Sequence, residues 1–130
     1  MTTPSITLAG LSDLNEVARL LAAQYREHEI PAPADQIERA ARGMIEEPRR
    51  GAIFLAHVDG KAVGLAGLAF TWTLEHGGLS AWLDELYVEP EGRSLGVGRA
   101  LLHAAIAHAR AAGAAAVDLE DISCPTSLTI

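Results

Sequence analysis

The sequence predicts an α+β domain with a mixed, mostly antiparallel central sheet flanked by helices. Two apolar segments flank Asp59-Gly60, the favoured turn of a tight antiparallel hairpin. Further along the chain, a helical pattern separates two strand-like segments, and such a crossover makes the second strand parallel to the first. A length of 130 residues is typical of one domain. We therefore expect residues 1–130 to form a single domain.

The N-terminal third is expected to contain one strand and two helices. Residues Ser5 to Ala9 alternate as a short strand, and Ser12 is expected to cap the first helix. The apolar stripe of that helix consists of Leu14, Val17, Leu21 and Tyr25. Pro31 and Pro33 interrupt the pattern. A second helix is expected from about Asp35 to Glu47, before Pro48, with Ile37, Ala41, Met44 and Ile45 on one face.

The rest of the chain is expected to form four strands and a third helix. The hairpin strands are Ile53 to Val58 and Ala62 to Phe70, and the turn Glu75 to Gly78 leads into a long strand, Ser80 to Val88. The helix that follows has apolar positions Val97, Leu101, Ala105, Ile106 and Ala109, and Gly113 is placed to end it. Ala115 to Leu119 is then expected to lie parallel to the strand before the helix.

The segment from Leu86 to Leu102 is the most informative part of the chain, because a strand changes into a glycine loop that opens directly onto a helix. The first N–H groups of a helix have no partners within it and carry partial positive charge, so they bind anions. Gly96 and Gly98 have no Cβ and would let a ligand approach the backbone closely. The loop therefore predicts a phosphate-binding site, and an ordinary turn before an amphipathic helix is the alternative.

The spacing Arg-x-x-Gly-x-Gly from Arg93 to Gly98, between a Leu-Tyr-Val strand and a Gly-Arg-Ala-Leu-Leu helix start, resembles the pyrophosphate-binding motif of the GCN5-related N-acetyltransferases (GNAT). These proteins transfer acetyl groups from acetyl-CoA to amines. The predicted order of elements also matches the family through its fifth strand, so the resemblance covers about residues 5–120. It implies a GNAT-like fold with acetyl-CoA as co-substrate.

The resemblance also implies which residues bind the co-substrate. The backbone N–H groups that would hold the pyrophosphate are those of Leu95, Gly96, Val97, Gly98 and Arg99. Arg93 and Ser94 would shape this loop, and the strand Leu86, Tyr87 and Val88 would offer backbone hydrogen bonds to the pantetheine arm, chiefly at Leu86 and Val88. As a cation in the first turn of a helix, Arg99 favours a bound phosphate, although a solvated arginine is the alternative.

Asp84 and Glu85 are the candidate catalytic and amine-binding residues. An alkylammonium with a pKa of about 10 costs roughly 4 kcal/mol to deprotonate at neutral pH, so a carboxylate or a water chain must accept its proton. The pair resembles the acidic residues that precede this strand in family members acting on polyamines. By simple alternation the two point to opposite faces, so only one should face the acetyl group unless a bulge intervenes. Alternatively, one is exposed and the other pairs with a buried polar group.

Other polar and aromatic residues have weaker signals. Tyr25 lies where the family builds substrate walls, with core packing as the alternative, and Tyr87 is expected to pack in the core. Glu27, His28 and Glu29 form either an acidic entrance or a solvated helix end. Trp72 and Trp82 are either core or substrate wall. The remaining histidines, which lack the spacing of a metal site, are His57, His76, His103 and His108.

Composition excludes several functional classes. A formal net charge of −7 disfavours binding to nucleic acid or to acidic membranes and favours cationic ligands such as amines. No stretch approaches the ~20 apolar residues that span a bilayer, and the N-terminus lacks a signal-peptide pattern. The single Cys124 cannot form an internal disulfide. We expect a cytoplasmic protein without a bound metal.

The resemblance to the GNAT family implies an N-acetyltransferase, and we expect it to act on a primary amine of a small cationic molecule or peptide. The family normally continues with a further helix, which often carries a tyrosine general acid, and further strands. Here the chain is expected to be truncated after the fifth strand, so a catalytically impaired CoA-binding module is the alternative. With no successor to cover it, strand Ala115 to Leu119 has an open edge. In a homodimer, the exposed edges or the C-terminal tails, Thr126 to Ile130 after Pro125, of two copies are expected to pair by strand exchange, with a monomer that has a frayed tail as the alternative.

Overall fold

The computed structural model describes residues 3–120 and 127–129. The strands and helices in chain order are β1 (Ser5–Leu8), α1 (Leu14–Glu27), α2 (Ala34–Glu46), β2 (Gly51–Val58), β3 (Lys61–Thr73), β4 (Gly78–Val88), α3 (Val97–Ala111), β5 (Val117–Glu120) and β6 (Ser127–Thr129). Single 3-10 turns at Leu11–Asp13 and Pro90–Gly92 precede α1 and the loop before α3. The predicted order of elements is confirmed through β5.

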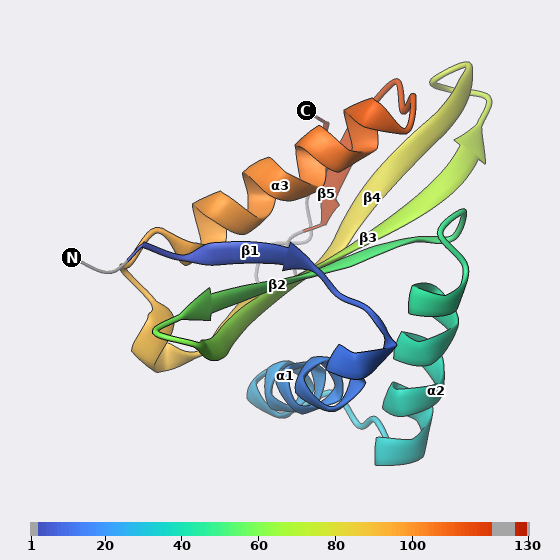
Figure 1. The fold of residues 1–130 in the computed structure, drawn as a ribbon. Coiled ribbons are helices and arrows are strands. Elements are labelled where there is room, and N and C mark those ends of the chain that lie inside the picture. Colours follow the sequence, from blue (N-terminus) through green and yellow to red (C-terminus); the bar gives the residue numbers. More distant parts are fainter. Residues whose placement is uncertain (1–2, 121–126, 130) are drawn as a thin grey trace.

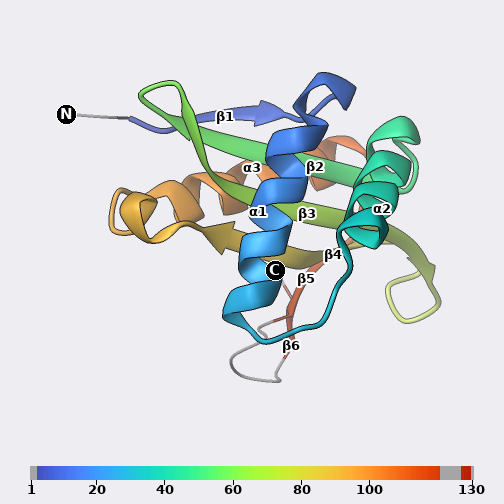
Figure 2. The same cartoon turned by 90° about the horizontal axis from the view of Figure 1, so that it is seen from below.

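The sheet has the strand order β1-β2-β3-β4-β5-β6. Neighbouring strands are antiparallel except for β4 and β5, which pair in parallel as predicted. Helix α3 lies on one face of the sheet, whereas α1 and α2 cover the other (Figures 1 and 2). The predicted α+β class, with a mixed and mostly antiparallel sheet between helices, is confirmed.

Each face of the sheet has its own apolar core. Val97, Leu101, Ala105 and Ala109 of α3 are buried against one face, as the helical stripe predicts. The apolar residues of α1 and α2 that are buried against the other face are Leu14, Val17, Leu20, Leu21, Ile37 and Ala41. Partly buried Tyr25, Met44 and Ile45 pack against this second core. The core in which a strand residue is buried therefore shows to which face of the sheet its side chain points.

Two turns follow the predicted chemistry. Asp59 and Gly60 both have positive φ, 52° and 78°, which is the conformation of a type I′ hairpin turn. Gly113 has φ 91° just after α3, and the N–H of Ala114 donates to Ala109 O at 3.0 Å, so the helix ends with a left-handed glycine cap.

Two features differ from the sequence predictions. Helix α1 begins at Leu14 after a 3-10 turn, and the Gly10 N–H donates to Asp13 Oδ2 at 2.9 Å, so Asp13 rather than Ser12 fixes this start. Strand β5 does have a successor, because β6 pairs with it antiparallel from Asp118↔Thr129 to Glu120↔Ser127. The edge assigned to a second copy is therefore covered by this chain's own β6. Cys124 and Pro125 lie outside the described residues.

Among the described residues, no helix combines the length and apolar character that crossing a bilayer requires.

Candidate active site

The sheet opens between β4 and β5. Their pairing ends at Leu83↔Leu119, whereas β4 continues to Val88. The Glu89 N–H donates to Val63 O at 2.8 Å, so by alternation the backbone groups of Tyr87 also face β3. The backbone groups of Leu86 and Val88 then face the open side. Among the described residues, no strand pairs with β4 beyond Leu83 on this side, so a strand edge is available at the two positions expected to contact pantetheine.

The loop after β4 leads into the N-terminus of α3. Ser94 and Gly96 have left-handed φ values of 72° and 77°. The first hydrogen bond at this end joins the Ala100 N–H to Gly96 O at 3.1 Å, so the N–H groups of Val97, Gly98 and Arg99 precede it. The N-cap residue of α3, Gly96, has no side chain to cap it, no capping side chain is found among the described residues, and the first turn has no acidic residue. This end of the helix is suited to binding an anion.

The space over the two loop glycines is open. A Cβ on Gly96 would have no heavy atom within 4 Å, and a Cβ on Gly98 would meet only Val88 Cγ2, at 3.9 Å. Internal packing therefore does not require glycine at either position, and φ at Gly98 is not in the left-handed range. Gly96 is favoured by its left-handed φ, whereas at Gly98 the fold does not need a missing side chain, which leaves room for a ligand to reach the backbone.

Arg93 fixes this loop to α1. Its Nε donates to Val88 O at 2.9 Å, and its Nη2 donates to both carboxylate oxygens of Glu27, at 2.8 and 2.9 Å. The guanidinium also lies 5.9 Å from the ring centre of Tyr87. The hydrogen bond from Arg93 holds the pKa of Glu27 below its usual range. Arg93 thus joins the loop to α1 through a contact with Glu27 that the sequence gives no sign of.

A β-bulge places both candidate carboxylates on one face of the sheet. Gly67 pairs with Glu85 but the next residue of β3, Leu68, pairs with Leu83, so Asp84 is the extra residue. The cores confirm the change of face, since Leu83 packs on the α3 side and Tyr87 on the α1 and α2 side. Unbroken alternation would put Leu83 and Tyr87 on the same face. Because of this bulge, Asp84 and Glu85 can both face one site.

Asp84 and Glu85 line a cavity of about 180 Å³ between α1, α2 and the sheet. Tyr25, which also lines it, donates its hydroxyl hydrogen to Glu85 Oε1 at 2.8 Å. Burial, this hydrogen bond and the charges of Glu85 and Asp84 raise the pKa of Tyr25 well above its usual range. The phenol therefore keeps its proton and acts as a donor to Glu85. The structure brings together the three residues that the sequence singled out for the amine site.

The cavity has walls that the sequence analysis missed. They are apolar side chains from both helices and the sheet: Leu21, Ala40, Ala41, Met44, Ile53 and Leu65. Gly67 completes the lining, and a Cβ there would lie 3.0 Å from Glu85 Cβ and 3.1 Å from Glu85 Cγ. A glycine inside a strand often marks a bulge or the close approach of another group, so Gly67 is the residue from which the sequence could have predicted the bulge.

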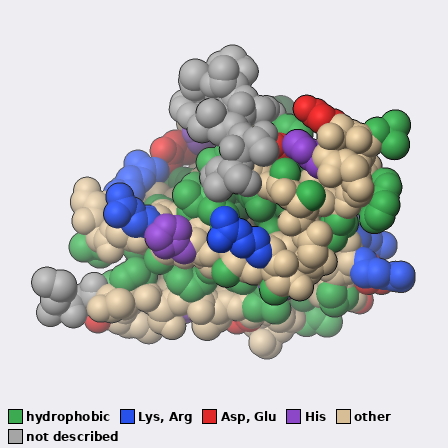
Figure 3. All heavy atoms as spheres, turned by 90° about the horizontal axis from the view of Figure 1, so that it is seen from above, with side chains coloured by type: hydrophobic (Ala, Val, Ile, Leu, Met, Phe, Trp, Pro, Cys, Tyr) green, Lys and Arg blue, Asp and Glu red, His purple; other side chains and the backbone are tan. Residues whose placement is uncertain are grey.

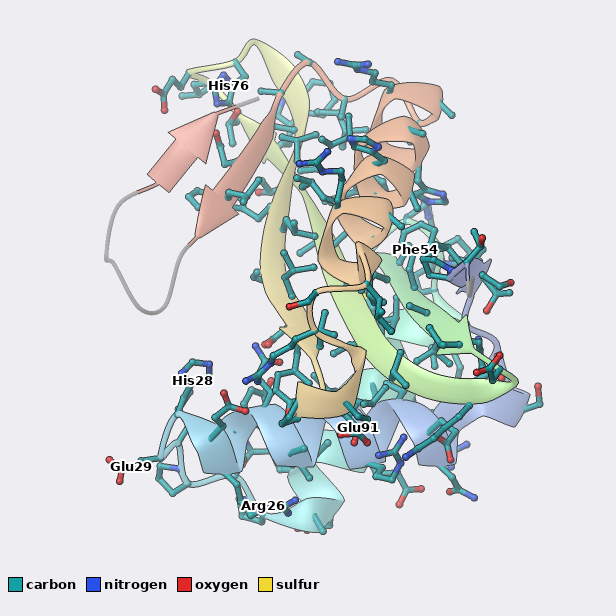
Figure 4. All side chains as sticks on the ribbon, turned by 90° about the vertical axis from the view of Figure 1, so that its left-hand side faces the viewer. Arg26, His28, Glu29, Phe54, His76 and Glu91 are labelled. Carbon is teal, nitrogen blue, oxygen red and sulfur yellow. The ribbon has the colours of Figure 1, made fainter. Side chains whose placement is uncertain are left out.

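Most other candidates lie away from this cavity. His28 and Glu29 are exposed at the end of α1 (Figure 4). At the far end of the sheet, His76 Nε2 lies 3.5 Å from Asp118 Oδ2. Trp72 is 75% exposed and so belongs to neither core. Trp82 is partly buried opposite Asp118 in the β4–β5 register.

The outer side of α3 carries exposed polar side chains. Arg99, His103 and Arg110 are exposed there, and Figure 3 shows Lys or Arg and His side chains across the middle of this surface. His108 instead faces inward, with its ring centre 5.3 Å from that of Phe54 and 6.1 Å from that of Phe70. Among the described residues, no three His, Cys, Asp or Glu side chains are placed to hold a metal ion.

Solved structures share this architecture. An integron cassette protein from the mobile metagenome of Cole Harbour Salt Marsh is 28% identical, with a TM-score of 0.85 over 89% of this chain and 76% of its own. A ribosomal-protein-alanine N-acetyltransferase from Brucella melitensis biovar Abortus 2308 is 24% identical, with a TM-score of 0.74 over 90% of this chain and 79% of its own. An aminoglycoside N-acetyltransferase in complex with CoA is 18% identical, with a TM-score of 0.79 over 93% and 78%. No curated protein matches the chain.

These likenesses place the chain among proteins with the acetyltransferase fold. The model of the Acetyltransferase (GNAT) family matches residues 14–124, which is most of the sequence. The chain belongs to the GNAT family of acetyltransferases.

Proposed function

We propose that the protein is an acetyl-CoA-dependent N-acetyltransferase that acetylates a primary amine of a small cationic molecule or peptide. One observation carries this proposal: the bulge turns both Asp84 and Glu85 into a cavity directly beside the open edge of β4. Two carboxylates attract a cationic amine and can accept its proton, and the adjacent edge is where an acyl carrier would lie.

The residues on the open side fit coenzyme A. The N–H groups of Val97, Gly98 and Arg99 would hold the pyrophosphate, since no side chain caps them and both loop glycines leave space above the backbone. The open edge at Leu86 and Val88 would pair with the amides of the pantetheine arm. A carbonyl has two lone pairs, so Val88 O can keep its hydrogen bond from Arg93.

The reaction is direct transfer to the amine. When bound, acetyl-CoA supplies a thioester whose carbonyl carbon is electrophilic. The ammonium first gives a proton to Glu85 or Asp84, and the exposed Asp84 can pass it to solvent. The free amine nitrogen then bonds to the carbonyl carbon while the Leu86 N–H stabilises the oxygen. The carbon–sulfur bond would then break with its electron pair on the departing thiolate, and the second proton of the nitrogen would pass through water to that thiolate, which leaves as the thiol.

The test is acetyl transfer by the wild type and by Glu85→Gln, with Glu38→Gln as a matched control. Glu38 is exposed on α2, and within the described residues its one ion pair is with Arg42. Loss of a general base should lower kcat/KM of Glu85→Gln by about 10²-fold or more. Glu38→Gln should keep wild-type kinetics. Equal activity of Glu85→Gln and Asp84→Asn with the wild type would contradict the proposal, and CoA binding without turnover of any amine would favour the binding-module alternative.

Assembly is a separate question. The homodimer stays a prediction. The open edge of β5, on which it was based, is covered by β6. Pairing between two copies would now have to use the outer edge of β6 or of β1, which are the terminal strands of the described sheet. Sedimentation at micromolar concentration should give twice the monomer mass, and a monomer there would end this prediction.

A further inference from the structure

The side chains that line the cavity beside the two carboxylates are of two kinds. Tyr25, Asp84 and Glu85 are polar; Asp84 is exposed, and the Tyr25 hydroxyl donates to Glu85. The other lining side chains are apolar and include fully buried Leu65, 2% exposed Ala41 and exposed Ala40. The amine site therefore continues inward as a pocket whose walls offer no hydrogen bonds to a second polar group.

Resting on the proposed function, we propose that the acceptor is a monocationic primary amine with an apolar group about the size of benzene, and that this group enters the cavity. The cavity measures about 180 Å³. An apolar cavity of about 150 Å³ is known to stay dry and to bind benzene. The ammonium would remain beside Asp84 and Glu85, where opposite charge compensates its partial loss of water.

The same walls disfavour polyamines. A diamine of matching length would bring its second ammonium against Leu21, Met44 and Ile53, which provide no charge partner. Burying an uncompensated charge is strongly unfavourable, whereas each buried methylene improves binding about fourfold. Apolar character, rather than the number of amino groups, is thus expected to select the acceptor.

The test compares hexylamine with ethylamine and with 1,6-diaminohexane. Titration calorimetry on the protein saturated with CoA gives affinities independent of turnover, and acetyl transfer gives kcat/KM. Hexylamine has four more methylenes than ethylamine and should exceed it by about 250-fold in both, given about fourfold per methylene. 1,6-Diaminohexane has the same chain length, and it should bind at least tenfold more weakly than hexylamine. Equal or tighter binding of the diamine would overturn the inference.

Two alanines on the exposed side of α2 provide a matched pair of variants. Ala40 lines the cavity and Ala34 does not, and both are exposed, so neither change to Phe disturbs the core. Ala40→Phe should remove most of the hexylamine preference, whereas Ala34→Phe should keep it. Met44→Ala removes a wall and should move the optimum to a longer chain. An unchanged preference in Ala40→Phe would place the apolar group elsewhere and refute the inference.

The two proposals fail in different ways. If CoA raises Tm and diamines are acetylated as well as hexylamine, the acetyltransferase proposal stands and the apolar acceptor is wrong. If CoA neither raises Tm nor supports transfer, the acetyltransferase proposal fails. Calorimetry with hexylamine alone then still decides whether the cavity binds an apolar amine.

Discussion

Replacing Gly98 by Glu is expected to change CoA binding and the stability of the unliganded protein in opposite directions. Gly98 is the second residue of α3, and a Cβ there meets only Val88 Cγ2 at 3.9 Å, so the new side chain fits without displacing the fold. It also places bulk and negative charge where the diphosphate of CoA is expected. The variant should therefore lose CoA binding while the unliganded protein gains stability.

The magnitudes follow from helix energetics. Removing a glycine from a helix contributes about 0.5 kcal/mol, and a carboxylate in the first turn adds about 0.3–1 kcal/mol. For 130 residues the unfolding entropy near Tm is about 0.27 kcal/mol/K, so roughly 1 kcal/mol corresponds to a rise of about 4 °C. CoA at 100 times its Kd should stabilise the wild type by about 2.7 kcal/mol, or about 10 °C.

Thermal unfolding with and without CoA measures both quantities in one experiment. Gly98→Glu should melt about 4 °C above the wild type without ligand and show no shift with CoA. Gly43→Ala, which removes a glycine from α2 far from the loop, should keep the full shift. A persistent shift in Gly98→Glu would show that CoA binds elsewhere. A lower Tm without ligand would show that the space above Gly98 is not open.

Three further predictions concern side chains around the cavity and the loop. Tyr25→Phe removes the hydroxyl that donates to Glu85 at 2.8 Å. Because hydrogen bonds to charged groups contribute about 1.5–3 kcal/mol, kcat/KM should fall roughly tenfold or more. Unchanged kinetics would exclude a positioning role for Tyr25. Gly67→Val places a side chain 3.0 Å from Glu85 Cβ and should lower kcat/KM while CoA still raises Tm; loss of the CoA shift would instead indicate disruption of the sheet. The pKa of Glu27 is lowered by Arg93, so their ion pair should stabilise the fold above the ordinary glutamate pKa of about 4.3 and lose that effect as the pH falls through the lower folded-state value. Urea unfolding should accordingly show that Glu27→Gln is less stable than the wild type at pH 7, with a difference that shrinks as the pH falls below about 4.3, and a constant difference between the two would contradict the assignment.

The sequence by itself determined the local features of this protein. Asp59-Gly60 forms the predicted type I′ turn because both positions need positive φ, which Asp and Gly tolerate. Helix α3 buries the predicted apolar stripe and ends at Gly113, and the glycine loop opens at its N-terminus as expected. These features depend on residues within a few positions of each other, so composition and spacing are sufficient to predict them.

Only the tertiary structure decided how the site is assembled. Simple alternation predicts that Asp84 and Glu85 point to opposite faces of the sheet. The bulge in β4, where its pairing with β3 shifts register at Gly67, instead brings both side chains to one face. The contact of Arg93 with Glu27 and the apolar walls of the cavity join α1, α2 and the sheet across long stretches of chain. Such contacts follow from the way layers pack and strands register, and no spacing within a single segment records them.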